Sequence, residues 1–134
     1  MDVKNKRVVV TGAASGIGKS LCEAFHQAEA KSVIAVDINL DGAQETADSV
    51  DGIAVKANVG NEKDIINLIE KADEHVGGID IFCSNAGIGG VPGFFEVEAS
   101  DWQNIWDVNV QSHIFAAKHV LPQMIERGEG YLVN

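Results

Sequence analysis

Residues Val8–Ser20 read VVVTGAASGIGKS, a run of valines followed by glycines at positions 12, 16 and 18. Glycine has no Cβ, so the backbone of such a turn can approach a phosphate group closely. A helix that starts directly after the turn adds unpaired N–H groups and the positive end of its dipole. The stretch therefore predicts a strand, a phosphate-binding turn and a helix in that order.

The same alternation of short and long apolar patterns continues along the chain. Short runs rich in Val and Ile are typical of strands buried on both faces of a parallel sheet. They lie at Arg7–Thr11, Val33–Asp37, Ile53–Ala57, Ile79–Ser84 and Tyr131–Asn134. Longer segments with apolar residues three and four apart are typical of covering helices. Those residues are Ile17, Leu21, Ala24, Phe25 and Ala28, then Ile65, Ile66, Leu68, Ile69 and Ala72, with a weaker helix over Leu40–Val50.

A third long helix is predicted from Asp101 to about Glu126. Ser100 or Asp101 is the expected N-cap, and Gly128 is expected to end the helix. Pro122 falls inside the pattern, which predicts a kink or an early stop there. The expected apolar side consists of Trp102, Ile105, Trp106, Ile114, Ala117, Leu121 and Met124.

Strands and helices in this order predict a doubly wound α/β fold, with a parallel sheet and helices on both faces. We expect one dinucleotide-binding domain of the Rossmann type over residues 1–134. The ligand cleft of such a fold lies beyond the carboxyl ends of the strands.

Composition restricts the classes of function. The chain has 134 residues, with 20 acidic and 10 basic side chains and a formal net charge of −10. This charge argues against binding to nucleic acid, whose phosphates require a basic surface. No apolar run is long enough to span a membrane, and no secretory signal opens the chain. Cys22 and Cys83 lack the spacing of a metal or redox pair, and the histidines lack metal-ligand spacing. We therefore expect a cytoplasmic protein with free thiols and no metal.

An aspartate ends the second predicted strand. Asp37 stands 19 residues after Gly18, where a carboxylate can accept hydrogen bonds from the ribose hydroxyls of an adenosine. It would repel a 2′-phosphate by about 4 kcal/mol at ~4 Å and an effective dielectric constant near 20. The neighbouring Ala14, Ser15 and Ile38 offer no compensating cation. NAD is therefore favoured over NADP, unless Asp37 only caps the next helix.

Two other interpretations of the glycine turn remain open. Gly18-Lys19-Ser20 is similar to the end of a nucleoside-triphosphate P-loop. That motif requires a glycine five positions before Gly18, where this chain has Ala13, and Gly12 is one residue too early. A tight turn with a purely structural role is the other interpretation.

Thr11-Gly12-Ala13-Ala14-Ser15-Gly16-Ile17-Gly18 resembles the TGxxxGxG cofactor loop of the short-chain dehydrogenase/reductase family. Three further motifs follow in the family's order. Asn58-Val59 resembles an Asp-Val pair that contacts adenine, Ser84-Asn85-Ala86-Gly87 resembles an NNAG motif, and Asp107-Val108-Asn109-Val110 resembles the segment with a catalytic asparagine. The similarity spans essentially the whole chain. It implies that the domain is cut short after its fifth strand, so that this strand and one side of the long helix are expected to lack their usual cover.

This resemblance implies NAD as cofactor and assigns the residues that bind it. They are Gly12, Ser15, Gly16, Ile17, Gly18, Asp37, Ile38, Asn58, Val59, Asn85, Ala86 and Gly87. Asn109 is implied to help hold a water in a proton relay. Each assignment has a structural alternative: Asn58 and Asn85 could satisfy backbone groups in turns, and Asn109 could bond to a neighbouring strand.

The family's reaction is hydride exchange between nicotinamide and a small alcohol or ketone, often in homo-oligomers. Its catalytic serine, tyrosine and lysine belong after the fifth strand, in a segment with a YxxxK motif. The only tyrosine here is Tyr131, and the matching lysine would stand at position 135, so Tyr131 is not carried over as catalytic. Loss of the proton donor alone costs roughly 10² to 10⁴ in rate, so we expect no useful turnover from these residues alone. The alternative is a noncatalytic dinucleotide-binding or interaction module on the same fold.

Overall fold

Five parallel strands form one sheet in the order β3-β2-β1-β4-β5 in the computed structural model, which describes residues 2–90, 93 and 95–134. The strands are β1 (Arg7–Thr11), β2 (Ser32–Asp37), β3 (Ile53–Lys56), β4 (Ile81–Cys83) and β5 (Tyr131–Val133). All five predicted strands are confirmed, although β4 is three residues shorter than its apolar run. Residues 79, 80 and 84 of that run lie in the connections on either side.

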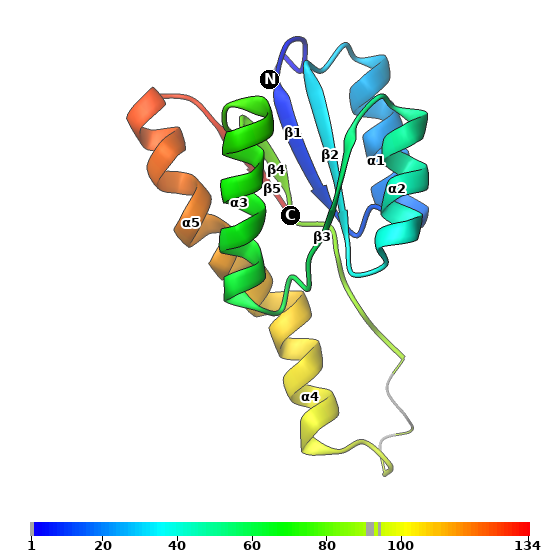
Figure 1. Ribbon diagram of the computed structural model, residues 1–134. Helices are drawn as coiled ribbons and strands as arrows, with labels where there is room; N and C mark the ends of the chain where they lie inside the picture. The colour runs from blue at the N-terminus through cyan, green and yellow to red at the C-terminus, as the bar shows by residue number, and fades with distance from the viewer. Residues whose placement is uncertain (1, 91–92, 94) are drawn as a thin grey trace.

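Helices cover both faces of the sheet (Figure 1). The covering helices are α1 (Gly16–Gln27), α2 (Leu40–Ser49), α3 (Glu62–Val76) and α5 (Ser112–Arg127), and α4 (Ala99–Trp106) projects beyond the sheet. The helices α1 and α2 lie on one face, and α3 and α5 lie on the other. The strand order reverses at β1, and right-handed crossovers place the later helices on the opposite face. The doubly wound α/β prediction is confirmed.

The core consists of two layers separated by the sheet. Val9 packs in the layer beneath α3 and α5, whereas Val8 and Val10 pack in the layer beneath α1 and α2. All three valines have no exposed surface, as expected for a central parallel strand whose successive side chains point to opposite faces. The predicted inner sides of α2 and α3 are also buried, including Ala47 and Leu68.

The predicted helix from Asp101 to Glu126 is two α-helices joined by a π-helical turn, η1 (Asp107–Gln111). The N-cap is Glu98, not Ser100 or Asp101, and the carboxylate of Asp101 accepts the backbone N–H of Glu98 at 2.9 Å. Gly128 ends α5 in a left-handed conformation, as predicted. The early stop is wrong, because α5 continues through Pro122 to Arg127.

The predicted apolar side of that long helix is largely wrong. Only Met124 of its members is buried, and the row that packs on the sheet is Ser112, Ala116, Val120 and Met124. Trp102, Trp106, Ile114 and Leu121 are all more than one-third exposed. The extra residue in η1 rotates α4 relative to α5, so a pattern counted at 3.6 residues per turn combines two different sides. The uncovered side of the helix and the sheet edge at β5 were both expected, and both are exposed.

Both cysteines are buried free thiols, as predicted. Burial raises the pKa of Cys22 to about 12 and that of Cys83 to about 11, so neither forms a reactive thiolate near neutral pH. No helix within residues 2–90, 93 and 95–134 is long and apolar enough to cross a membrane. The same ranges contain no group of three His, Cys, Asp or Glu side chains that could hold a metal ion.

Candidate functional site

A cleft of about 260 Å³ lies at the carboxyl ends of the strands, where the fold predicts a ligand site. The residues that line it follow β1, β2, β3 and β4 or belong to the helix that closes one side. They are Gly12, Asp37, Ile38, Ala57, Asn58, Val59, Ala86, Gly87, Ile88, Asn104 and Val108. The tertiary structure thus brings together segments that lie as far apart in sequence as residues 12 and 108.

The glycine turn brings the start of α1 close to the end of β1. Gly12 and Gly16 have φ angles of +71° and +54°, a region that favours glycine. A Cβ on Gly18 would lie 2.0 Å from the carbonyl oxygen of Gly12. Ser15 is the N-cap of α1 but makes no side-chain capping hydrogen bond, so the first N–H groups of the helix have no side-chain partner there. Such an open N-terminus suits an anionic group.

Thr11 and Asn85 join the glycine turn to the segment after β4. The hydroxyl of Thr11 accepts the backbone N–H groups of Asn85 and Ala86, both at 3.0 Å. It also donates to the carbonyl oxygen of Cys83 at 3.2 Å, and the amide of Asn85 donates to the carbonyl oxygen of Thr11 at 2.9 Å. The structural role that the sequence left open for Asn85 is therefore present.

Replacing Thr11 with valine is expected to lower the free energy of unfolding by about 2 kcal/mol, because two backbone N–H groups would lose their acceptor in a buried place. Urea unfolding followed by circular dichroism measures the change. Thr11→Ser keeps the hydroxyl and is the matched control, with an expected loss of less than half as much. Equal losses in the two variants would show that the methyl group contributes as much as the hydroxyl, and an unchanged stability of Thr11→Val would show that the hydroxyl does not matter.

The carboxylate of Asp37 fixes the local backbone at the end of β2. Its Oδ2 accepts the N–H of Ala14 at 3.0 Å, and its Oδ1 accepts the N–H of Asn39 at 2.9 Å. Asn39 is the N-cap of α2, and its side chain accepts the N–H of Gly42 at 3.3 Å. Asp37 is therefore not the helix cap, and both of its oxygens keep lone pairs at the wall of the cleft.

Asn58 and Val59 follow β3 at the far end of the cleft. The Oδ1 of Asn58 accepts the N–H of Gly60 at 3.0 Å, and the backbone N–H of Asn58 donates to Asp64 at 2.9 Å. Val59 is only 7% exposed and anchors the turn in the core. The two residues thus present one polar and one apolar group at adjacent positions.

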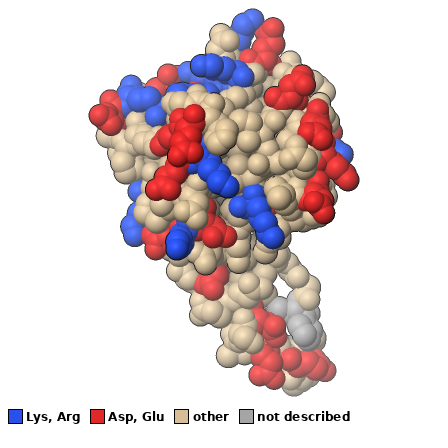
Figure 2. Space-filling view, viewed as in Figure 1, with Lys and Arg blue, Asp and Glu red and all other residues tan. Residues whose placement is uncertain are grey.

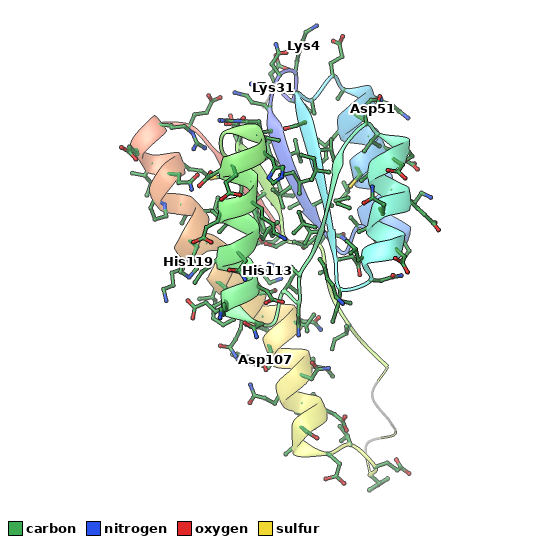
Figure 3. The ribbon with its side chains drawn as sticks, viewed as in Figure 1. Lys4, Lys31, Asp51, Asp107, His113 and His119 are labelled. Carbon is green, nitrogen blue, oxygen red and sulfur yellow. The ribbon has the colours of Figure 1, made fainter. Side chains whose placement is uncertain are left out.

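Asn109 lies in the π-helical turn and binds the segment after β4. Its Oδ1 accepts the N–H of Ile88 and its Nδ2 donates to the carbonyl oxygen of Ile88, both at 2.8 Å. Asp107, labelled in Figure 3, opens the same turn, and its carboxylate accepts a hydrogen bond from Gln103 at 2.7 Å and another from Gln111. The structural alternative for Asn109 is therefore realised, with a loop as its partner in place of a strand.

Seven of the residues predicted to bind the cofactor line the cleft, namely Gly12, Asp37, Ile38, Asn58, Val59, Ala86 and Gly87. The remaining five predicted residues do not line the cleft: Ser15, Gly16, Ile17 and Gly18 belong to the glycine turn and the start of α1, and Asn85 is hydrogen-bonded to Thr11. Asn109 contacts the lining of the cleft through Ile88. Ile17 is 74% exposed, so its predicted place on the packed side of α1 is wrong. The exposed Ile17 follows from the start of α1 at Gly16, beyond the edge of the core.

Sequence reasoning missed four residues of the cleft: Ala57, Ile88, Asn104 and Val108. Ala57 and Ile88 directly follow or flank recognised motifs and could have been found by extending them. Asn104 and Val108 are four positions apart across the junction of α4 and η1. Val108 belongs to the recognised motif Asp107–Val110 and could have been found with it, whereas the sequence carries no signal for Asn104, whose place depends on how this junction sits over the sheet.

The charge on the lining of the cleft is negative. Among the residues that line the cleft, Asp37 carries the charge, and none of the lining residues is Lys or Arg. The chain has no Lys or Arg between residues 72 and 117, and Figure 2 shows Asp and Glu side chains alone among the charged groups on the projecting end formed by α4 and the segment before it. An anionic group placed beside Asp37 would be repelled by its carboxylate.

Comparison with known proteins identifies relatives over nearly the whole chain. The family described as short chain dehydrogenase matches residues 6–134. Glucose 1-dehydrogenase 2 of Bacillus subtilis (strain 168) is 32% identical, and the match covers 99% of this chain and 54% of that protein. An uncharacterized oxidoreductase of Staphylococcus aureus (strain MRSA252) is 33% identical, with 97% of this chain and 57% of that protein covered. The chain spans about half the length of these curated relatives.

The fold also occurs among solved structures. A crystal structure titled as a ribose-5-phosphate isomerase from Brucella melitensis 16M superposes with a TM-score of 0.89. The match covers 99% of this chain and 52% of that one, at 24% sequence identity. This likeness shows a shared fold.

Proposed function

This chain belongs to the short-chain dehydrogenase family, and from that premise we propose that it is the NAD(H)-binding part of an oxidoreductase. The reaction proposed is hydride transfer between nicotinamide and a small alcohol or carbonyl substrate. The observation that carries the proposal is the cleft that joins the glycine turn, Asp37 and Asn58 at one edge of the sheet. Two features of these residues fit a dinucleotide. Gly18 has no Cβ, so the start of α1 can pack directly against the backbone of Gly12. The N-terminus of α1 has no side-chain cap and is open to an anionic group.

We propose a segment of the chain for each part of the dinucleotide, following the order of the strands in the sheet. The pyrophosphate would lie at the glycine turn (Gly12–Gly18) and the start of α1, and Asp37 would accept hydrogen bonds from the adenosine ribose. The base would lie beyond Asp37, at Asn58 and Val59, because β3 lies next to β2 at that end of the sheet. The segment Asn85–Gly87 after β4 would follow the nicotinamide-side ribose. When bound, the cofactor supplies the site that accepts or donates hydride.

We propose that Asn109, in the π-helical turn, positions the segment that follows β4. Its two hydrogen bonds to Ile88 hold the backbone that lies next to Ala86 and Gly87. Because both polar atoms of the side chain are used in this way, the residue orients the segment that would carry the nicotinamide-side ribose. The water of the proton relay that the family resemblance implies would then be held near Asn109.

The catalytic serine, tyrosine and lysine are proposed to lie outside these 134 residues, because the chain spans about half of its relatives. Residues 1–134 alone would then bind the dinucleotide without useful turnover. The name of the Bacillus subtilis relative refers to the oxidation of a sugar hydroxyl, which supports an alcohol or ketone as the substrate class. Assembly as a homo-oligomer belongs to the same proposal.

NADH is expected to bind at least about tenfold more tightly than NADPH, because the carboxylate of Asp37 repels a 2′-phosphate. Both affinities are measured by titrating the protein, isolated from its natural source, against each dinucleotide and recording nicotinamide fluorescence. Asp37→Asn should lower the ratio of NADH affinity to NADPH affinity roughly tenfold, because the repelling charge is removed. Asp41→Asn removes the same charge in the first turn of α2, outside the cleft, and should leave the preference unchanged. Equal affinities of the unaltered protein for the two dinucleotides would contradict the preference, and binding of neither would refute the proposed function.

A further inference from the structure

Helix α4 forms part of one wall of the cleft, although none of its residues is buried. It projects beyond the sheet and packs mainly against η1, the turn that follows it (Figure 1). Most of the stability of a short helix in a protein comes from packing, and these eight residues have little of it. The helix is therefore held less firmly than the rest of the fold, and a ligand in the cleft would add to its contacts.

Asn104 is the residue of α4 that faces the cleft. It lines the cleft together with Val108, four positions further along the chain. Four helical residues span about 6 Å, so Asn104 lies that much closer to the projecting end of α4 than Val108 does. The turn after β3 lies against the other end of α4, because a Cβ on Gly60 would stand 3.2 Å from the Cβ of Asp107. Asn104 therefore overhangs the side of the cleft that is formed by the residues after β3.

The side-chain amide of Asn104 is available to a ligand. Within the described residues it has no hydrogen-bond partner, whereas the other three side-chain amides of α4 and η1 are engaged. Gln103 and Gln111 donate to Asp107, and Asn109 uses both of its polar atoms on the segment after β4. Asn104 thus offers one donor and one acceptor at the wall of the cleft.

Charge restricts the part of a dinucleotide that α4 can contact. Asp101 lies in the first turn of α4 and Asp107 opens η1, and the chain has no Lys or Arg between residues 72 and 117. These carboxylates would repel the pyrophosphate, so an uncharged part of the dinucleotide suits this wall. Asn58 and Val59, beside which the base of the adenosine is proposed to lie, line the cleft directly before Gly60.

Resting on the proposed function, we infer that Asn104 hydrogen-bonds the adenosine half of the dinucleotide and that this contact holds α4 against the rest of the fold. The adenosine would lie between the ends of β2 and β3 on one side and α4 on the other. A contact that exists only when α4 is in place shifts the helix toward that place. Because coupling is reciprocal, the factor by which Asn104 strengthens binding equals the factor by which the bound ligand stabilises the position of α4.

ADP-ribose is the probe, because it has the adenosine and the pyrophosphate but no nicotinamide. Calorimetric titration measures its affinity, and hydrogen–deuterium exchange of residues 99–106 measures the order of α4, both with the protein as it is made in its natural source. Asn104→Ala should weaken the binding of ADP-ribose roughly fivefold, the effect of one neutral hydrogen bond. Saturating ADP-ribose should slow exchange in α4 of the unaltered protein by about the same factor, and should not slow it in Asn104→Ala.

Gln103→Ala is the matched control, because it removes an amide from the neighbouring position of α4, which does not line the cleft. The affinity for ADP-ribose and the slowing of exchange should both match those of the unaltered protein. Reduced nicotinamide mononucleotide has no adenosine and should leave exchange in α4 unchanged.

Three results would overturn the inference and leave the proposed function intact. They are binding of ADP-ribose without slower exchange in α4, equal losses of affinity in Asn104→Ala and Gln103→Ala, and slowing of exchange by the mononucleotide. Binding of NADH without binding of ADP-ribose would have the same meaning. If neither ADP-ribose nor NADH binds, the inference fails together with the proposed function.

Discussion

Replacing Gly18 with alanine is expected to abolish NADH binding, with an affinity loss of roughly a hundredfold or more. The added Cβ would lie 2.0 Å from the carbonyl oxygen and 2.6 Å from the carbonyl carbon of Gly12. Both are backbone atoms, so no side-chain rotation relieves the contact, and α1 must move away from the end of β1. A shift on the order of 1 Å misplaces the N–H groups that would hold the pyrophosphate. Fluorescence titration with NADH measures the loss.

Gly89→Ala is the control for this substitution. A Cβ at Gly89 would meet nothing within 4 Å, and its φ is not in the left-handed region. Affinity for NADH and the midpoint of urea unfolding should therefore change little. An affinity of Gly18→Ala equal to that of Gly89→Ala would refute the role of the close contact between Gly18 and Gly12.

Replacing Asp80 with asparagine is expected to lower the free energy of unfolding by about 3 kcal/mol, because a nearly buried ion pair loses one partner. Asp80 is 9% exposed and accepts hydrogen bonds from Arg7 Nη2 at 2.5 Å, Nε at 2.8 Å and the backbone N–H at 2.9 Å. Arg127 lies 3.8 Å from the same carboxylate and donates to the carbonyl oxygen of Ile79. One carboxylate thus joins β1, the entry to β4 and the end of α5.

Urea unfolding at pH 7 measures this loss, and Glu29→Gln provides the control. Glu29 pairs with Lys4 at 2.7 Å, but both side chains are more than half exposed. An exposed pair contributes roughly 0.2–1 kcal/mol, so the control should lose much less than Asp80→Asn. Similar losses in the two variants would show that the burial of Asp80 does not matter.

The ion pair between Asp80 and Arg7 also predicts that the free energy of unfolding depends on pH in the acid range. Hydrogen bonds and charge from Arg7 hold the pKa of Asp80 at about 2, below its ordinary 3.8. The unfolded chain therefore binds a proton at higher pH than the folded chain does. The contribution is fully present above about pH 4 and is lost as pH falls through about 2, in total roughly 2.5 kcal/mol. The unfolding free energies of the natural protein and Asp80→Asn should converge over this range, and parallel curves would contradict the assignment.

Local patterns in the sequence were sufficient for the strands, for the side of α3 that is buried and for the position of the cleft. Runs such as Val8–Val10 place apolar side chains on both sides, so a strand buried on both faces accommodates them. The carboxyl ends of parallel strands meet at one edge, which brings Gly12, Asp37 and Asn58 together in any fold of this order. These features depend on neighbours in sequence or on strand order, and both can be derived from the residues alone.

The tertiary structure decided the features that depend on contacts between distant segments. The π-helical turn changed which side of α5 meets the sheet, because one extra residue in a turn alters the helical phase without a local signal. Arg7 and Asp80 are 73 residues apart, and no spacing predicts their pairing. The orientation of the Asn58 amide and the bond between Asn109 and Ile88 likewise depend on single hydrogen bonds. The residue types fix which groups are present, but only the packed backbone fixes which donor meets which acceptor.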